Sequence, residues 1–379
     1  MFRIVDRYVL RQFVQFYVIC YLSLTGLYIV IDAFGKLEHF VDQTSSTGEL
    51  LASLGKYYGY QSLAFFNRTS GILSLIAAMF TVTWSQRYNE VTALLAAGVP
   101  RLRVLRPVIL AAVTVSLGAA ATRELVVPRI RHELARDTKN LSGGGAQSLQ
   151  SRWDNQTDVL LAGDSVVIAS RKILRPAFKL PRRLAVHGKQ LAAAEADYFP
   201  PAGDRPGGYW LREVATPEAV LRSPSLRDAE GQIIVASPAD TPWLGEGEVF
   251  VVSGVPFELL ASGSNWRDYA STPELVRELA SPSVELGADV NVAVHRRLLA
   301  PLTDLTLLML GLPLVVSRGA RNPFLAIGLA LVVVTGFFLV ALGGQSLGSS
   351  GWLRPALAAW APLLVFVPVA VGLSDPLRH

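Results

Sequence analysis

Six long apolar runs, in two groups of three, dominate the pattern of hydrophobic and polar positions along the chain. The first group covers Gln12–Ile31, Thr69–Trp84 with a backward extension to Gln61, and Pro107–Thr122 preceded by Leu102–Leu105. The second group covers Leu298–Ser317, which contains Asp304, then Phe324–Leu342 and Pro355–Leu373. About 20 mostly apolar residues make a helix long enough to cross the hydrocarbon core of a membrane. The pattern therefore predicts six transmembrane helices, arranged three plus three around a long segment of lower hydropathy.

The period of the apolar positions changes toward two in that long segment, from about Gln147 to Val255. Short runs rich in β-branched and aromatic residues alternate with Pro, Gly, Asp and Ser: DVLLAG, SVVIAS, RLAVHG, GYWLREV, QIIVAS and VFVVSG. Such regularly spaced short runs predict an antiparallel, jellyroll-like all-β domain. Gly143–Gly145 would be a flexible joint before it. A helical return to the membrane would begin at Thr272, ahead of Pro273.

The predicted domains are residues 1–128 with the first three spans, 129–295 with the β domain and the helical return, and 296–379 with the last three spans. Composition agrees with a membrane protein. Charged residues make up 17% of the chain, against roughly 25% in soluble domains. This excludes an ordinary soluble enzyme and a disordered protein. The single cysteine, Cys20, excludes a disulfide scaffold.

The distribution of basic residues predicts the orientation of the spans. Lys and Arg in short loops favour the cytoplasmic side. One side would carry Arg3, Arg7, Arg11, Arg87, Arg101, Arg103, Arg106, Arg318, Arg321 and Arg378, and the other side Lys36, Lys56 and Arg354. The net charge of +5 thus reflects cytoplasmic loops and not nucleic-acid binding. We expect both termini in the cytoplasm and the β domain outside, which in a bacterium is the periplasm.

The turn between the second and third spans, about residues 86–98, holds a short amphipathic helix. It begins at Glu90, places Val91, Leu94 and Leu95 on one face, and ends before Gly98. Such a helix docks into a groove of a soluble partner or lies on the lipid headgroups, and the pattern leaves both interpretations open. In the docking interpretation the apolar side chains are anchors and Glu90 meets an arginine of the partner. Ala97, Gly98 and Arg101 complete the predicted docking residues.

Several motifs resemble the permeases of the lipopolysaccharide export system, the LptF/LptG family. One is the pattern of Glu90, Ala93, Leu94, Ala96, Ala97 and Gly98, followed by Arg101 and Arg106-Pro107. Others are Ile4–Phe13, Glu124–Pro128, Arg296–Leu305, Gly311–Ser317 and Leu353–Pro362. The order of three spans, an outer insertion and three spans is also similar to that family. The resemblance covers both membrane halves, whereas the outer domain matches only by position and strand content.

This resemblance implies the permease subunit of an ABC transporter that moves lipopolysaccharide out of the bacterial inner membrane. Its implied partners are a cytoplasmic ATPase dimer, which receives the turn helix, a second homologous six-span permease, and a periplasmic jellyroll bridge protein. The chain has no G-x-x-x-x-G-K-[ST] motif to hold ATP phosphates. We therefore expect no catalytic residue and no cofactor in this chain, with ATP and Mg²⁺ bound by the partner.

A lipopolysaccharide site needs cations near the outer headgroups and apolar walls below them. The basic residues predicted at the outer ends of the spans are Lys36, Arg68, Arg123, Arg296 and Arg297. Lys36 is the strongest candidate, because the family has a basic residue at that end of its first span. Flanking cations also bind ordinary lipid phosphates, so this alternative stays open for each residue. Asp304 is an intramembrane acid, which by itself indicates function or pairing with a nearby arginine.

Two other functions compete with lipopolysaccharide export. One is an ABC-type permease or force-transmitting subunit for another lipid or for lipoproteins, although such subunits typically have four spans. The other is a membrane-bound serine hydrolase built on Gly344–Gly348, which matches G-x-S-x-G around Ser346. That motif requires a strand before it and a helix after it, whereas an apolar span precedes it and we expect an outer loop to follow. The scattered histidines predict no metal site.

Overall fold

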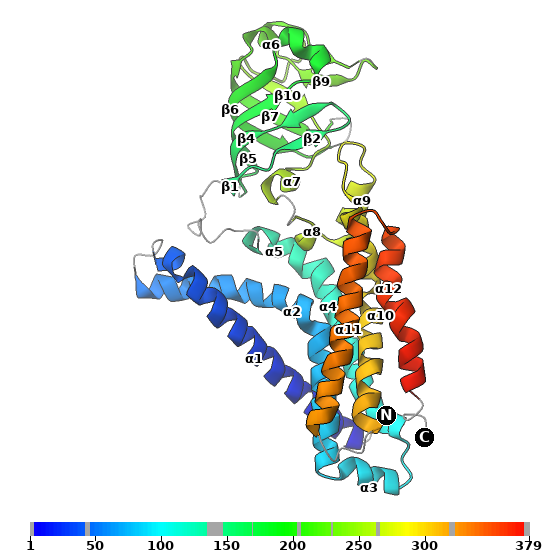
Figure 1. Ribbon diagram of the computed structural model, residues 1–379. Helices are drawn as coiled ribbons and strands as arrows, with labels where there is room; N and C mark the ends of the chain where they lie inside the picture. The colour runs from blue at the N-terminus through cyan, green and yellow to red at the C-terminus, as the bar shows by residue number, and fades with distance from the viewer. Residues whose placement is uncertain are drawn as a thin grey trace. The chain divides into compact units, whose positions relative to one another are not determined.

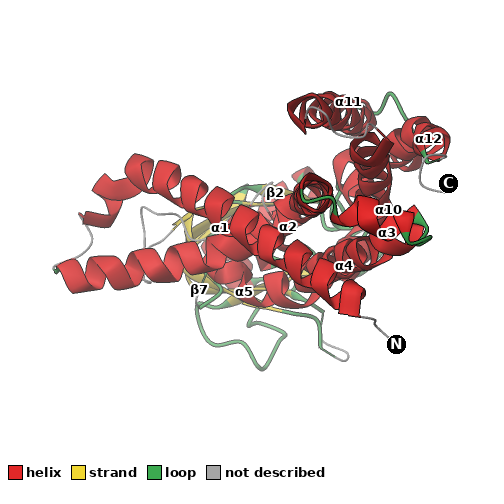
Figure 2. Ribbon diagram, turned by 90° about the horizontal axis from the view of Figure 1, so that it is seen from below, coloured by secondary structure: helices red, strands yellow, loops and turns green. Residues whose placement is uncertain are grey.

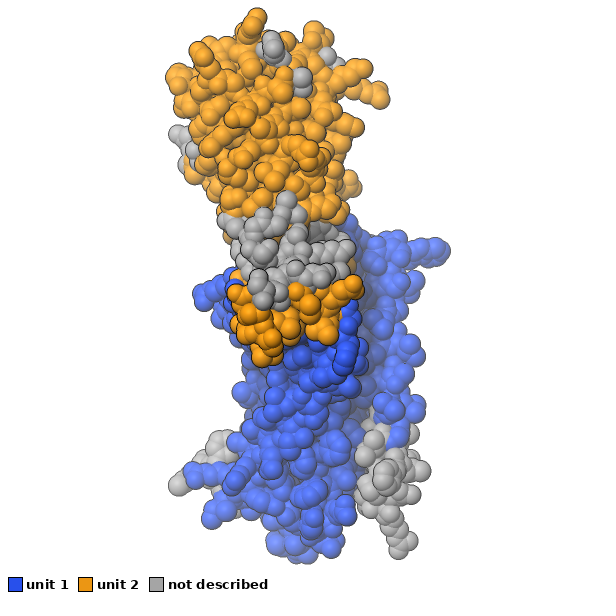
Figure 3. All heavy atoms as spheres, turned by 90° about the vertical axis from the view of Figure 1, so that its left-hand side faces the viewer, with its two compact units in different colours: residues 1–35, 56–129, 287–379 blue, residues 36–55, 130–286 orange. Residues whose placement is uncertain are grey.

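The computed structural model describes residues 4–41, 46–134, 147–317 and 323–374, apart from gaps at 169, 203–205, 229 and 263–265. The chain forms two compact units, coloured separately in Figure 3. The first contains residues 1–35, 56–129 and 287–379, and the second contains residues 36–55 and 130–286. The predicted glycine joint at 143–145 lies outside the described residues.

Long helices build most of the first unit. The helices of the N-terminal part are α1 (Ile4–Val41), α2 (Thr47–Arg87), α3 (Glu90–Ala96) and α4 (Arg101–Ala121). A π-helical turn, η1 (Thr122–Val126), joins α4 to α5 (Val127–Leu134). The C-terminal part contains α10 (Ala288–Ser317), α11 (Pro323–Ser349) and α12 (Pro355–Leu373). Among the described residues, six helical segments are long and apolar enough to cross a membrane, which confirms the six predicted spans.

The helices extend beyond the apolar runs that predicted them. α1 continues past Ile31 to Val41, and α2 already begins at Thr47. α10 begins at Ala288, so Arg296 and Arg297 lie inside this helix and not at its start. The third span does not end at Thr122, because the π-turn carries the helix onward to Leu134. Hydropathy marks only the part of a helix suited to hydrocarbon, while backbone hydrogen bonding continues into polar sequence.

The core of the first unit lies where α2, α4 and α10 pack together. Ala77, Val108 and Leu310 are fully buried there, and they pack with Phe13 of α1 and Phe337 of α11 in one cluster. Figure 2 looks along the helices and shows α10, α11 and α12 grouped on one side. α1, in contrast, exposes a long apolar face.

An antiparallel sheet of ten strands forms most of the second unit (Figure 1). The strands are β1 (Gln147–Ser148), β2 (Arg152–Asp154), β3 (Val159–Leu161), β4 (Gly163–Val167), β5 (Lys172–Lys179), β6 (Gln190–Phe199), β7 (Gly208–Thr216), β8 (Leu226–Arg227), β9 (Ile233–Ala236) and β10 (Val249–Val252). The order is β1-β4-β5-β6-β7-β10-β9-β8, with β2 paired to β3 and β3 to β5. This confirms the antiparallel β region in the middle of the chain.

The predicted strands differ from the observed ones at two places. The run RLAVHG is a 3-10 helix, η3 (Arg182–His187), because Pro181 and Gly188 flank it and Leu184 donates its amide back to the Pro181 carbonyl. The long central strands β5 and β6 were not predicted. Pro176 interrupts the first, and the alanines and Glu195 of the second are typical of helices. Pairing between neighbouring strands overrides these local preferences.

Short helices complete the second unit: η3, α6 (Glu218–Arg222), α7 (Phe257–Ser262), α8 (Trp266–Tyr269) and α9 (Thr272–Leu279). The predicted helical return exists, but its cap is Ser271 and not Thr272. The Ser271 hydroxyl accepts the Glu274 amide, and the Glu274 carboxylate accepts the Ser271 amide. This reciprocal capping box satisfies amides that the helix itself leaves unpaired.

Candidate docking helix and substrate site

The short helix α3 lies at the same end of the first unit as the start of α1 and the end of α12 (Figure 1). Both of its ends use left-handed backbone: Asn89 has φ 58° before the helix, and Gly98 has φ 79° after it. Asn tolerates this conformation and Gly adopts it freely. Pro100 then caps α4, which begins at Arg101. The helix predicted from Glu90 to Ala97 is therefore present, with Ala97 as its C-terminal cap.

The Glu90 carboxylate joins α3 to two transmembrane helices. The Tyr8 hydroxyl of α1 donates to Oε1 at 2.7 Å, and the Ser85 hydroxyl of α2 donates to Oε2 at 2.8 Å. Gln12, one turn along α1, donates its amide to the Tyr8 hydroxyl oxygen at 2.7 Å. A carboxylate has about four acceptor positions, so Glu90 retains capacity for an arginine from a partner.

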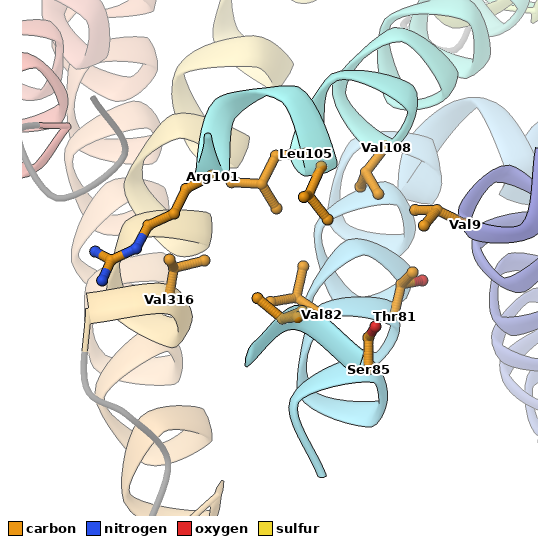
Figure 4. A pocket seen from close by; sticks show the side chains of 10 residues that line it. Val9, Thr81, Val82, Ser85, Arg101, Leu105, Val108 and Val316 are labelled. Carbon is orange, nitrogen blue, oxygen red and sulfur yellow. The ribbon is translucent and has the colours of Figure 1, made fainter. Parts of the chain in front are cut away.

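A small cavity of about 20 Å³ lies at this end of the helices, beside the start of α3. Figure 4 shows its walls from α1, α2, α4 and α10, including Val9, Val82, Leu105 and Val316. Val91 of α3 also lines it. Of the other predicted docking residues, Arg101 is a lining residue of the cavity, Leu94 and Leu95 are half-buried, and Ala97 and Gly98 are exposed.

Asp304, the predicted intramembrane acid, lies between three helices of the first unit. The Ser116 hydroxyl of α4 donates to its carboxylate at 2.5 Å, and the Arg123 guanidinium of η1 acts on it electrostatically. Gly71 of α2 completes the site, because any side chain there would overlap the Asp304 carboxylate. The acid thus links α10 to α4 by a hydrogen bond and lies directly against α2.

The predicted substrate cations occupy different surroundings. Arg123 is half-buried in the π-turn and donates to the Asn67 carbonyl at 3.4 Å. Arg296 is exposed and donates to the Gln345 side chain of α11 at 2.7 Å. Arg68 is exposed and Arg297 half-buried. Lys36 is half-buried and belongs to the second unit, so it is described separately from the other four.

A charged cluster in the second unit holds α5, α7 and α9 together. Arg131 forms ion pairs with Glu258 at 3.0 Å and with Glu274 at 3.3 Å, and Arg171 also contacts Glu258 at 3.3 Å. Glu278 lies nearby, where burial, and next the charge of Glu258, raise the pKa of its carboxyl. Its Oε2 atom is buried and accepts no hydrogen bond within the described chain.

Two motifs that suggested other chemistry have no suitable geometry. Gly344–Gly348 lies inside α11, so a helix and not a strand precedes Ser346. Ser346 therefore lacks the strand and sharp turn that expose a catalytic serine, and the hydrolase alternative loses its structural basis. His, Cys, Asp and Glu side chains do not gather into a possible metal site anywhere in the described ranges.

Sequence reasoning missed Tyr8, Ser85, Gln12, Ser116 and Gly71 as members of these sites. Only the spacing of Tyr8 and Gln12, four residues apart on one helix face, offered a local signal. The Glu90 and Tyr8 partners are 82 positions apart, and no pattern in a single sequence shows that separation.

Comparison with known families gives a match over both membrane halves. The family described as lipopolysaccharide export system permease LptF/LptG matches residues 7–161 and 214–375. The chain belongs to the LptF/LptG family. Comparison with curated proteins gives no match.

The first matched range of this LptF/LptG permease covers α1 from Arg7 onward and reaches the end of β3, and the second begins within β7 and continues through α12. They also contain every residue of the Glu90 and Asp304 sites. Members of this family are transporter subunits and not enzymes. The chain is therefore a multi-pass membrane permease of lipopolysaccharide export, which works in a complex with other subunits.

Proposed function

We propose that this permease is a membrane subunit of an ABC transporter that extracts lipopolysaccharide from the bacterial inner membrane. A separate cytoplasmic ATPase dimer drives it, and a second six-span permease pairs with it. The extracted lipid passes through the β domain of the second unit, which lies in the periplasm, toward a jellyroll bridge protein. The observation that carries this proposal is the family match over both membrane halves, including the α3 turn.

The ATPase docks at α3. This helix connects two spans, and no residue in it is fully buried. It lies at the end of the first unit where α1 begins and α12 ends (Figure 1). The basic residues Arg101, Arg103 and Arg106 follow it directly, and such clusters favour the cytoplasmic side. Half-buried Leu94 and Leu95 are available to a groove of the ATPase.

The lipid phosphates bind basic residues of the outer half: Arg68, Arg123, Arg296 and Arg297 of the first unit, and separately Lys36 of the second unit. Acyl chains lie against the apolar face of α1, where Leu22, Ile31 and Phe34 are exposed. The runner-up is a related permease or force-transmitting subunit that carries another lipid or a lipoprotein. Stimulation of the ATPase by purified lipopolysaccharide, but not by lipoprotein, would distinguish the two.

Purification of the tagged full chain from its own membrane tests the proposal. We expect an ABC ATPase and a second six-span permease in the same detergent-resolved complex. Leu94→Asp places a charge in the docking face and should reduce ATPase recovery at least tenfold, about 1.4 kcal/mol, with the permease still inserted. Thr92→Asp, on the exposed side of the same helix, is the matched control. Wild-type chain recovered without any ATPase would contradict the proposal.

A further inference from the structure

The contacts of Glu90 connect the docking helix to one particular span. Tyr8 and Ser85 occupy both oxygens of the Glu90 carboxylate, at 2.7 Å and 2.8 Å. Ser85 belongs to α2, which runs directly into α3, so this bond closes a local turn. Tyr8 belongs to α1, which is remote in sequence. The Tyr8 bond therefore links α3 to a helix that is remote from it in sequence.

α1 is anchored in the core at this same end and exposes one apolar side farther along. Near its start Val9 and Phe13 are buried in the core, and Asp6 forms an ion pair with Arg103 of α4 at 3.9 Å. Farther along, Leu22 and Ile31 are 62% and 66% exposed. Figure 1 shows α1 diverging from α4 and α10 in this direction. On this exposed side, α1 packs against no neighbouring helix of the described first unit that would oppose a pivot.

Farther along, α1 contacts α2 through the Tyr58 hydroxyl, which donates to Asp32 at 3.0 Å, and through aromatic side chains. Tyr28 stacks on Phe65, and Tyr21 meets Phe66 edge to face. The Tyr21 hydroxyl also donates to the Ser62 carbonyl at 3.0 Å. Flat rings slide over one another with little change in buried area, so these contacts permit movement of α1 relative to α2.

The cavity provides space for the movement at the anchored end. It lies between Val9 of α1, Val91 of α3 and the facing residues of α2, α4 and α10 (Figure 4). Its volume of about 20 Å³ would hold one water, but its nearly all-apolar walls offer too few partners to retain one. Small shifts of Val9 or Val91 into this space meet no resistance from packed atoms.

We propose that Glu90 is the joint through which movement of α3 turns α1, and that Tyr8 and Ser85 are positioning residues that hold this joint. This rests on the proposed function, because the ATPase is what moves α3. When the partner displaces α3, the Glu90 carboxylate carries the Tyr8 hydroxyl with it, and α1 pivots about Phe13. The apolar face of α1 then changes its position relative to α10–α12, which alters the surface offered to a lipid.

Distances between spin labels test the joint in the full chain. The labels replace Ile31 of α1 and Trp352 of the α11–α12 turn, both exposed, in a Cys20→Ser background. Tyr8→Phe removes only the hydroxyl and should broaden the distance distribution of the purified chain. Tyr21→Phe is the matched control, because it removes another hydrogen bond between α1 and α2 but leaves Glu90 unchanged. It should retain the wild-type distribution.

The same label pair in the assembled complex completes the test. ATP should shift the wild-type distance, and Tyr8→Phe should abolish the shift. Tyr8→Phe combined with Glu90→Ala should behave like Glu90→Ala alone, because Glu90→Ala already removes the acceptor of the Tyr8 hydrogen bond. If Tyr8→Phe kept the wild-type distance distribution, or if Tyr8→Phe and Tyr21→Phe changed it equally, the proposed role of Glu90 would be wrong. A wild-type chain that never binds an ATPase would instead overturn the proposed function, while the measurement on the isolated chain still decides the joint.

Discussion

At the scale of single residues, two carboxylates connect helices of the first unit in different ways. Glu90 is bonded at the end of the helices by hydroxyls of α1 and α2, and Asp304 is enclosed between α2, α4 and α10. The first retains acceptor capacity toward a partner. The second is enclosed so closely that a methyl group added at Gly71 would overlap its carboxylate.

Gly71→Ala tests how closely Asp304 is enclosed. The added methyl group overlaps the Asp304 carboxylate, and overpacking of this kind costs about 1–3 kcal/mol. We expect a lower thermal unfolding temperature in detergent. The control is Gly118→Ala, since no atom lies near the added methyl group there. Asp304→Ala should remove the additional cost of Gly71→Ala, and a Gly71→Ala chain as stable as the control would show that the site can relax.

Glu278 makes the stability of the second unit depend on pH. Its raised pKa means that the folded state holds this proton at a pH where the unfolded carboxyl, near 4.5, has lost it. Stability from this group therefore increases as pH falls through the raised pKa, and the ionised carboxylate is unfavourable at neutral pH. Asp240 acts in the opposite direction, because hydrogen bonds from Ser225 lower its pKa.

Glu278→Gln should accordingly raise the unfolding temperature at pH 7.5, and its advantage should shrink toward pH 5. The comparison with wild type at each pH removes the contributions of Asp240 and other groups. Glu285→Gln, at an exposed position, is the control. If the unfolding temperature of Glu278→Gln rose further above that of the wild type as the pH fell, the pKa of Glu278 would not be raised in the folded state.

At the scale of elements, the sequence predicts the helices better than the strands. Each apolar run became a helix, because hydrocarbon demands that a spanning segment satisfy its own backbone hydrogen bonds. Strands depend on neighbours that are remote in sequence. β5 and β6 form despite Pro176 and an alanine-rich run, since each pairs on both sides.

The candidate site divides in the same way. The α3 helix follows from local signals at Glu90 and Gly98, so the sequence predicts it within one residue. The Tyr8, Ser116 and Gly71 contacts depend on how helices pack, which a single sequence does not reveal. The π-turn at Arg123 likewise has no pattern that predicts it.

Gly98→Ala tests the end of α3. Gly98 has φ 79°, and a side chain in this left-handed region costs roughly 1–2 kcal/mol. We expect the turn into α4 to shift and the recovery of the ATPase with the permease to decrease several-fold. Ala93→Ser, on the exposed side of α3, should leave recovery unchanged, and an undiminished yield from Gly98→Ala would mean that docking tolerates a different turn.

At the scale of the whole molecule, the predicted topology places α3 and the sheet on opposite sides of the membrane. Thr92→Cys and Val186→Cys, both at exposed positions, test this in a Cys20→Ser background. An impermeant maleimide added to spheroplasts should label Val186→Cys at once and Thr92→Cys only after the membrane is permeabilised. Immediate labelling of Thr92→Cys would show that α3 lies on the outer side, opposite to the predicted orientation, and would exclude a cytoplasmic ATPase at α3.

The path of the sheet ends at β1 and β8, and each of these strands has two residues. A long outer strand would present a row of vacant amides and carbonyls to any passing chain. The two-residue strands β1 and β8 present very few such amides and carbonyls. Along the described residues, a chain that joined either end would form few backbone hydrogen bonds there, so its recognition would depend mainly on side chains.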